Sequence, residues 1–174
     1  MLYEYGVSLN YEWSREKILQ VIEQYGCYVT SVFDPEGESP DFTYSTGISK
    51  TYDAPELIII GLNSKLAHSI VNNYAGRLKN GEKFSIGEFY EGFLEGFDVT
   101  FCEVSQENKQ EFMLSACWYN NDKFEALQLV YPTTSGIWPW DAAANQSFLT
   151  LQPCLATKSA WWLLKGRLVN IWAR

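Results

Sequence analysis

Residues 56–61 read Glu-Leu-Ile-Ile-Ile-Gly, and this short, apolar, β-branched run predicts a buried central strand. The stretch before it, Phe42–Ile48, is also rich in β-forming residues and predicts the preceding strand. We expect that strand to form a hairpin with a strand in Cys27–Phe33, because the turn-forming stretch Asp34–Pro40 separates the two. Gly47 indicates a bulge or a close approach of backbone. These stretches predict the first half of a sheet.

The remaining chain alternates helical and strand-like patterns. Helices are expected from a cap at Ser14 to Tyr25, from a cap at Asn63 or Ser64 to Lys79, and from a cap at Ser105 to Tyr119. Strands are expected at Phe97–Val104 and Phe124–Tyr131. Short strands and turns are expected at Lys83–Gly96, and mainly loop at Thr133–Leu155. This order predicts a single α+β domain over residues 1–156, with a largely antiparallel sheet and helices packed mainly on one face.

The C-terminal segment, residues 157–174, differs from the rest of the chain. It predicts an amphipathic tail helix, since Leu164, Leu168, Ile171 and Trp172 share one face. A helix docked on the domain is the simplest interpretation. A contact between copies in a homo-oligomer and a membrane-surface contact are the alternatives.

The length and charge of the chain limit its class. A chain of 174 residues with 47% hydrophobic residues fits one domain with a core of its own. The net charge is −8, and the last 18 residues hold four basic side chains and no acid, so residues 1–156 carry −12. This charge argues against nucleic acid as a partner and favours a basic one, although solubility alone also explains it.

Cysteine and histidine are sparse. The four cysteines, Cys27, Cys102, Cys117 and Cys154, are widely spaced and form no Cys-x-x-Cys pair, so we expect no metal site and buried structural thiols. His68 is the single histidine and is expected at the surface. The start of the chain has no signal-peptide pattern, and no apolar run is long enough for a transmembrane segment, so a cytoplasmic location with reduced thiols is expected.

Two polar, turn-rich segments are the candidate binding residues. Tyr44, Thr46 and Gly47 lie in a run of hydroxyl side chains that suits a phosphate or a carboxylate, although a polar strand edge with a bulge explains the same pattern. The chain has no phosphate-binding Gly-x-x-x-x-Gly-Lys motif and no Gly-x-Ser-x-Gly nucleophile elbow. No catalytic residue can be assigned from the first segment.

The second segment is the turn Trp138-Pro139-Trp140-Asp141. Its proline fixes the backbone, so the two aromatic rings suit stacking on a flat ligand or anchoring a partner, with burial in the core as the alternative. We expect one shared site between Tyr44–Ser49 and Trp138–Asp141. An acid–base pair of Glu56 and Asp141 is a minor hypothesis.

These segments resemble a bacterial family catalogued as domain of unknown function 4262. The resemblance is carried by Phe42–Ile48, Pro55–Leu62, Leu127–Pro132, Gly136–Trp140 and Gln152-Pro153, and it spans about residues 14–155. Thr133-Thr134 stands where the family commonly has an acidic residue, and the tail lies outside the resemblance. The Pro-Glu-Leu and Gly-Leu layout is also loosely similar to suppressor-of-fused-type modules, several of which neutralise toxins. The resemblance implies no established activity.

The sequence favours a non-enzymatic, cytoplasmic binding module, in particular an immunity protein that neutralises a cognate basic toxin. The acidic body, the aromatic content and the lack of a catalytic set motivate this hypothesis, which requires no cofactor. The alternative is an enzyme that binds a small molecule or a flavin-type cofactor between the two segments.

Overall fold

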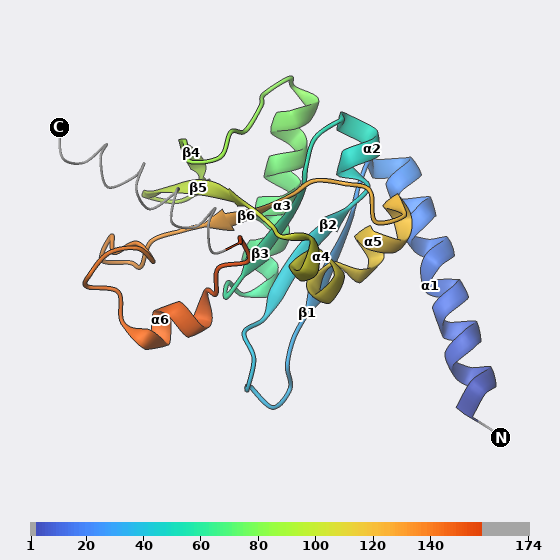
Figure 1. The fold of residues 1–174 in the computed structure, drawn as a ribbon. Coiled ribbons are helices and arrows are strands. Elements are labelled where there is room, and N and C mark those ends of the chain that lie inside the picture. The colour runs from blue at the N-terminus through green and yellow to red at the C-terminus, as the bar shows by residue number, and fades with distance from the viewer. Residues whose placement is uncertain (1–2, 158–174) are drawn as a thin grey trace.

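A computed structural model describes residues 3–157 of the chain (Figure 1). Its helices are α1 (Tyr3–Tyr25), α2 (Ile48–Tyr52), α3 (Ser64–Lys79), α4 (Gln106–Phe112), α5 (Leu114–Asn120) and α6 (Gln146–Leu151). Its strands are β1 (Tyr28–Val32), β2 (Phe42–Thr46), β3 (Glu56–Ile60), β4 (Phe89–Leu94), β5 (Phe97–Glu103) and β6 (Ala126–Val130).

The described strands form one sheet in the order β1-β2-β3-β6-β5-β4. All neighbouring pairs are antiparallel except β3 and β6, which run parallel at the centre. The predicted hairpin of β1 with β2 is confirmed, with Tyr28 opposite Thr46. The α+β class and the largely antiparallel sheet are confirmed as well.

The two central strands form the core because both of their faces are covered. All five residues of β3 are buried, as expected for the apolar run at 56–61. Leu57 and Ile59 belong to an apolar cluster with Ile70 and Tyr74 of α3. Fully burying an aliphatic side chain of this size stabilises a fold by about 1.5–3 kcal/mol, so this strand is a major source of stability.

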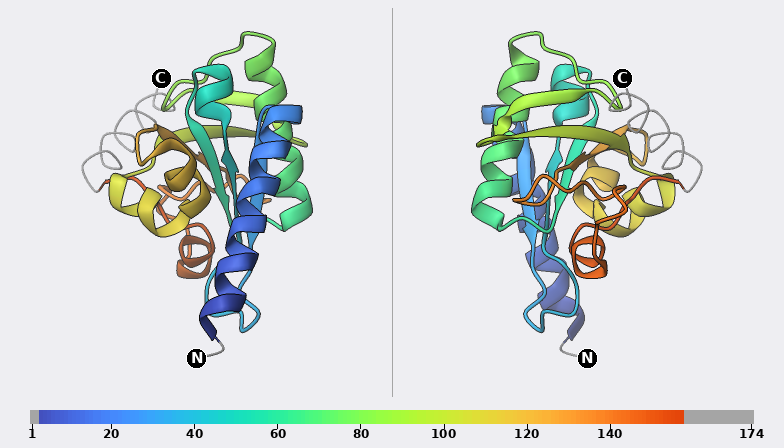
Figure 2. Two further views of the ribbon diagram at one scale, coloured as in Figure 1. Left: turned by 90° about the vertical axis from the view of Figure 1, so that its right-hand side faces the viewer. Right: turned by 90° about the vertical axis from the view of Figure 1, so that its left-hand side faces the viewer.

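Helices lie on both sides of the sheet. The 16-residue α3 covers one face. On the opposite face Ile58 and Ile60 pack with Met113 and Ala116 from the short α4–α5 segment. Figure 2 shows α3 and the α4–α5 pair on opposite sides of the sheet, with α1 running past its β1 end. The long helix α3 thus packs as expected, and the short helices add a second layer.

Three local predictions need correction. The first helix begins at Tyr3 rather than at Ser14; no proline interrupts residues 3–13, so nothing forces a late start. The helix capped by Ser105 breaks at Met113, whose backbone is not helical and whose side chain is fully buried. The expected loop 133–155 contains α6, capped by Asn145, whose side chain accepts from the Phe148 N–H at 2.9 Å.

The predicted tail helix and its proposed oligomer contact fall on residues 158–174, outside the described residues. Within residues 3–157, no helix has the length and apolar character needed to cross a membrane.

Candidate functional site

The first predicted segment is organised around Glu56, which is fully buried at the start of β3. Its carboxylate accepts hydrogen bonds from the backbone N–H groups of Gly47, Ile48 and Ser49 at 2.8–3.3 Å. Ser45 Oγ donates to it at 2.6 Å. A buried carboxylate is tolerated only when donors replace its hydration. Glu56 therefore caps the N-terminus of α2, and the bonds leave it no visible role as an acid or base.

Gly47 makes this capping possible. It precedes α2 with φ = 106°, a conformation that favours glycine. A Cβ at this position would lie 2.9 Å from a side-chain carbon of Ile22 in α1. The expectation of a close backbone approach at Gly47 is therefore confirmed, although the feature is a helix cap and not a bulge.

Tyr44 and Thr46 are also occupied by internal contacts. Both side chains are buried, and their hydroxyls meet Ser115 of α5: Ser115 Oγ donates to the Tyr44 hydroxyl at 3.0 Å and lies 2.8 Å from Thr46 Oγ1. These bonds join β2 to α5. β2 lies between β1 and β3, so these hydroxyls belong to an interior strand and not to a polar strand edge, and a ligand role for Tyr44, Thr46 and Gly47 stays a prediction.

The second predicted segment forms a compact turn. The Asp141 carboxylate accepts from the Trp138 N–H at 2.7 Å, and the Asp141 N–H donates to the Trp138 carbonyl at 3.0 Å. The two indoles stack with centroids 4.8 Å apart and planes within 11° of each other. Trp138 is 8% exposed and Trp140 6%, packed with Cys102 and Val130. In this arrangement the rings cover the sheet, and a ligand role for them stays a prediction.

The two segments lie at opposite ends of the sheet. Gly47 is bonded to Glu56 at the start of β3, whereas Trp138 follows the end of β6, which runs parallel to β3. They also belong to different apolar clusters. The expected shared site between Tyr44–Ser49 and Trp138–Asp141 is therefore not formed, and neither is the Glu56–Asp141 pair.

His68 and the four cysteines are the remaining reactive side chains of the described part of the chain. His68 is exposed, as expected, and its Nδ1 lies 3.1 Å from the side-chain amide nitrogen of Asn72. No cluster of His, Cys, Asp or Glu within residues 3–157 could hold a metal ion. Cys27, Cys102 and Cys117 are buried, as expected, while Cys154 is only half-buried.

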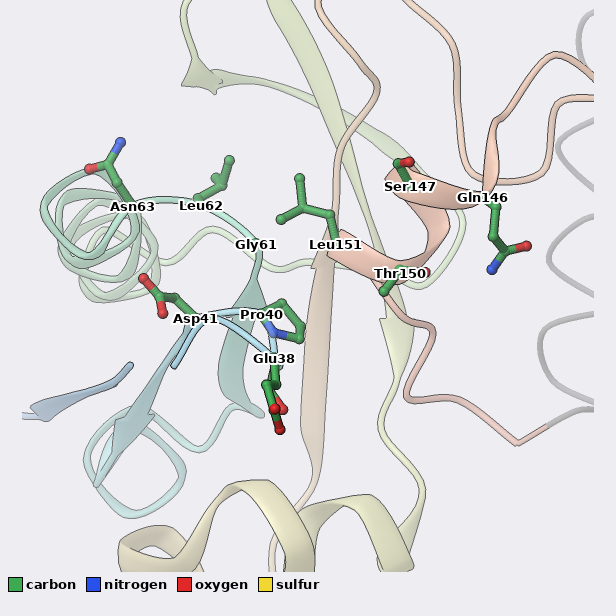
Figure 3. A pocket seen from close by; sticks show the side chains of 12 residues that line it. Glu38, Pro40, Asp41, Gly61, Leu62, Asn63, Gln146, Ser147, Thr150 and Leu151 are labelled. Atoms are coloured by element: carbon green, nitrogen blue, oxygen red, sulfur yellow. The ribbon is translucent and has the colours of Figure 1, made fainter. Parts of the chain in front are cut away.

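A pocket of about 660 Å³ opens at the other end of β3 from Glu56 (Figure 3). Three parts of the chain line it: the β1–β2 loop, the β3–α3 turn and α6. Its lining consists of Gly37, Glu38, Ser39, Pro40, Asp41, Gly61, Leu62, Asn63, Gln146, Ser147, Thr150 and Leu151. In Figure 3 the labelled residues of the β1–β2 loop and of the β3–α3 turn lie on the left and α6 lies on the right, with Leu151 at the end of α6 that faces the turn.

Gly61 sets the shape of this pocket. Its N–H donates to the Asp41 carbonyl at 2.8 Å, which ties the loop to the end of β3. It has φ = 82°, and a Cβ there would lie 2.5 Å from the Leu151 carbonyl oxygen. Only glycine lets α6 approach the β3–α3 turn this closely. The pocket therefore depends on Gly61, which the sequence pattern predicts only as the last residue of a strand.

The charge of the pocket is negative. Glu38 and Asp41 are the ionisable side chains of its lining, and among residues 3–157 no lysine or arginine lines it. Asp34 fixes the conformation of the β1–β2 loop, because its carboxylate accepts hydrogen bonds from the N–H groups of Glu36, Glu38 and Ser39 at 2.8–3.0 Å. These backbone hydrogen bonds, that from Glu36 foremost, hold the pKa of Asp34 below its usual value.

The sequence predictions missed this pocket. None of Tyr44, Thr46, Gly47, Trp138, Trp140 or Asp141 lines it. The one signal in the sequence was the acidic composition of residues 34–41, which contain four acids and no base. The approach of α6 to that loop depends on tertiary contacts, which a local sequence pattern does not predict.

Comparison with known proteins identifies the family. Residues 21–145 match the family model described as Domain of unknown function (DUF4262). The chain belongs to the DUF4262 family. The matched range includes the Glu56 cap, the acidic loop and the tryptophan turn, whereas α6 of this DUF4262 protein lies beyond it. Neither a curated protein nor a solved structure matches the chain.

Proposed function

We propose that this protein is a non-enzymatic binding module whose acidic pocket receives a basic side chain of a partner protein, in its specific form a cognate toxin that the module neutralises. The proposal places the protein in the cytoplasm. The observation that carries it is the pocket of Figure 3, where both ionisable side chains are carboxylates.

The lining suits a lysine or arginine. Such side chains combine an aliphatic stem with a cationic head. Leu62, Leu151 and Pro40 offer apolar surface for the stem, and Leu151 is 45% exposed. Glu38 and Asp41 offer oxygen acceptors for the head. The acidic body adds long-range attraction, which raises the association rate and weakens with salt.

The chemistry of the described residues also favours binding over catalysis. The most buried carboxylate, Glu56, is saturated by hydrogen bonds. The pocket lining holds serines and a threonine but no histidine or lysine to activate them. A binding role requires only the carboxylates and the apolar surface that line the pocket.

The test is an affinity capture from the native host with the tagged full-length chain as bait. The expected result is one stoichiometric, basic protein whose capture weakens as salt rises. Expressed alone, that protein should arrest growth, and co-expression of this chain should restore it. Failure to capture a stoichiometric protein would refute the proposal.

A matched pair of variants separates the pocket from net charge. The double substitution Glu38→Gln/Asp41→Asn removes two charges from the pocket. The control, Glu88→Gln/Glu95→Gln, removes two exposed charges near β4, at the far edge of the sheet. We expect the pocket variant to lose at least tenfold in affinity and the control to lose much less. Equal losses would leave general charge as the cause and contradict the pocket.

A further inference from the structure

Two of the four cysteines lie next to each other although they are distant in sequence. Cys102 lies on β5 and is fully buried, and Cys154 lies in the segment that follows α6. Cys154 interacts with the Cys102 thiol closely enough to raise the pKa of that thiol. This contact joins the sheet to the C-terminal end of the described chain.

The side-chain amide of Gln128 fixes this arrangement. Gln128 stands opposite Cys102 in the β5–β6 pairing, and its Oε1 accepts from Cys102 Sγ at 3.6 Å. Its Nε2 donates to the Pro153 carbonyl at 2.7 Å, and its Oε1 accepts from the Leu155 N–H at 2.8 Å. Both neighbours of Cys154 are therefore held by the amide that also contacts Cys102, so the two thiols are positioned by geometry.

The two thiols differ in a way that suits sequential chemistry. The neighbouring Cys102 thiol, aided by the Ala156 N–H, lowers the pKa of Cys154, which is half-buried and is the more exposed of the two thiols. The interaction with Cys154, together with burial, raises the pKa of Cys102. By contrast, burial is the main cause that raises the pKa of Cys27 and of Cys117 to about 11. The thiolate is the reactive form of cysteine, so Cys154 is the favoured nucleophile.

We propose that Cys102 and Cys154 are a redox-active dithiol that a peroxide converts into an intramolecular disulfide, with Cys154 attacking first and Cys102 resolving. The Cys154 thiolate attacks one oxygen of hydrogen peroxide, the O–O bond breaks, and hydroxide leaves and is protonated to water. Cys154 becomes a sulfenic acid. Cys102 then loses its proton and attacks Cys154 Sγ, the S–O bond breaks, and a second water leaves. The two thiols give up two electrons, which reduce the peroxide.

The consequence is a covalent link between β5 and residues 152–157. In the reduced protein this segment is held by hydrogen bonds of two glutamines. Gln128 holds it as described, and Gln152 exchanges bonds with both backbone groups of Tyr131, at 2.9 and 3.0 Å. The disulfide would add a permanent tie beside them.

The test treats the full-length, reduced protein with hydrogen peroxide, alkylates the remaining thiols and maps the peptides by mass spectrometry. We expect two of the four cysteines to escape alkylation and a single Cys102–Cys154 peptide pair. A reductant should restore all four thiols. Absence of that pair, at a peroxide dose that oxidises Cys154, would overturn the proposal.

Matched variants assign the roles. Cys154→Ser should abolish the link, and Cys102→Ala should leave Cys154 as a trappable sulfenic acid. Cys117→Ala removes another buried thiol and should leave the link intact. If Cys102→Ala fails to fold, Cys154→Ser and Cys117→Ala still decide the question. A link that forms equally in Cys154→Ser, or one that Cys117→Ala abolishes, would refute the assignment.

Discussion

The two ends of β3 each carry a carboxylate, and the two have opposite surroundings. Glu56, at the start of the strand, is fully buried and accepts from three backbone N–H groups and a serine. Asp41, beside the end of the strand, is exposed at the pocket, and its carboxylate accepts a long hydrogen bond from the Asp34 N–H at 3.4 Å.

This contrast teaches which carboxylate is accessible to a partner. A saturated buried carboxylate contributes to stability, because its donors would otherwise be left without partners. An exposed carboxylate contributes little to stability, and its oxygens can exchange water for a ligand. The Glu56 end is therefore structural, and the Asp41 end is the one suited to binding.

The largest expected effect is the loss of the Glu56 carboxylate. Glu56→Ala removes the acceptor for several buried donors, and each buried donor left without a partner costs about 1–3 kcal/mol. Chemical denaturation should show this loss in the free energy of unfolding. The matched change Asp41→Ala, at the open end, should stay within about 0.5 kcal/mol. Similar costs for both substitutions would contradict the contrast.

A pair of glycines sharpens the same comparison with a smaller effect. Gly47→Ala meets both an unfavourable φ of 106° and the side chain of Ile22. Gly37, in the acidic loop, has φ = 71°, but a Cβ added there would meet no atom within 4 Å beyond its chain neighbours. A non-glycine residue at such a positive φ costs about 1–2 kcal/mol in backbone strain, so Gly37→Ala should lower the free energy of unfolding by about that amount.

The Gly47 variant should cost more than its loop counterpart, since overpacking adds about 1–3 kcal/mol. Thermal unfolding of both variants against the parent chain measures the difference. Equal shifts in the melting temperature would show that Ile22 moves aside without cost.

The smallest expected effect is the pH response of the acidic loop. The pKa of Asp34 is lowered in the folded protein by backbone N–H groups. Because the pKa of Asp34 is lower in the folded state, its ionised carboxylate contributes to folding stability above the unfolded pKa of about 3.9. That contribution is lost as pH falls through the folded pKa. NMR titration of the Asp34 carboxyl group should give a midpoint below about 3.9, and the amides of Glu36, Glu38 and Ser39 should shift with it. A midpoint at or above that value would contradict the loop geometry.

Much of the fold could be predicted from local patterns. The run at 56–61 predicted a central strand because Leu57–Ile60 are all apolar, as expected of consecutive positions that are buried on both faces of a sheet. Asn63 and Ser105 cap α3 and α4 as predicted, since these side chains satisfy free N–H groups at helix starts. The break at Met113 could not be predicted, because core packing and not propensity decides it.

The candidate site could be predicted far less well. The hydroxyls near Gly47 were expected to face a ligand, but their partners, Glu56 and Ser115, come from other parts of the chain. The pocket combines residues 37–41, 61–63 and 146–151, and only tertiary contacts bring these ranges together. Local sequence indicated the acidic loop but not the helix opposite it.

The parallel pairing at the centre of the sheet constrains how the chain acquires its structure. β1, β2 and β3 pair with strands that are adjacent in sequence. By contrast, the other side of β3 pairs with β6, in which Ala126 stands opposite Glu56, so this pairing requires the chain to be complete beyond residue 126. Closing longer loops costs more entropy, so distant pairings form late. During synthesis the unpaired side of β3 therefore remains exposed as an apolar edge, and such edges promote aggregation. We expect ribosome-bound chains that end before residue 126 to bind a chaperone, and binding that is no stronger than that of the full-length chain would contradict this order of assembly.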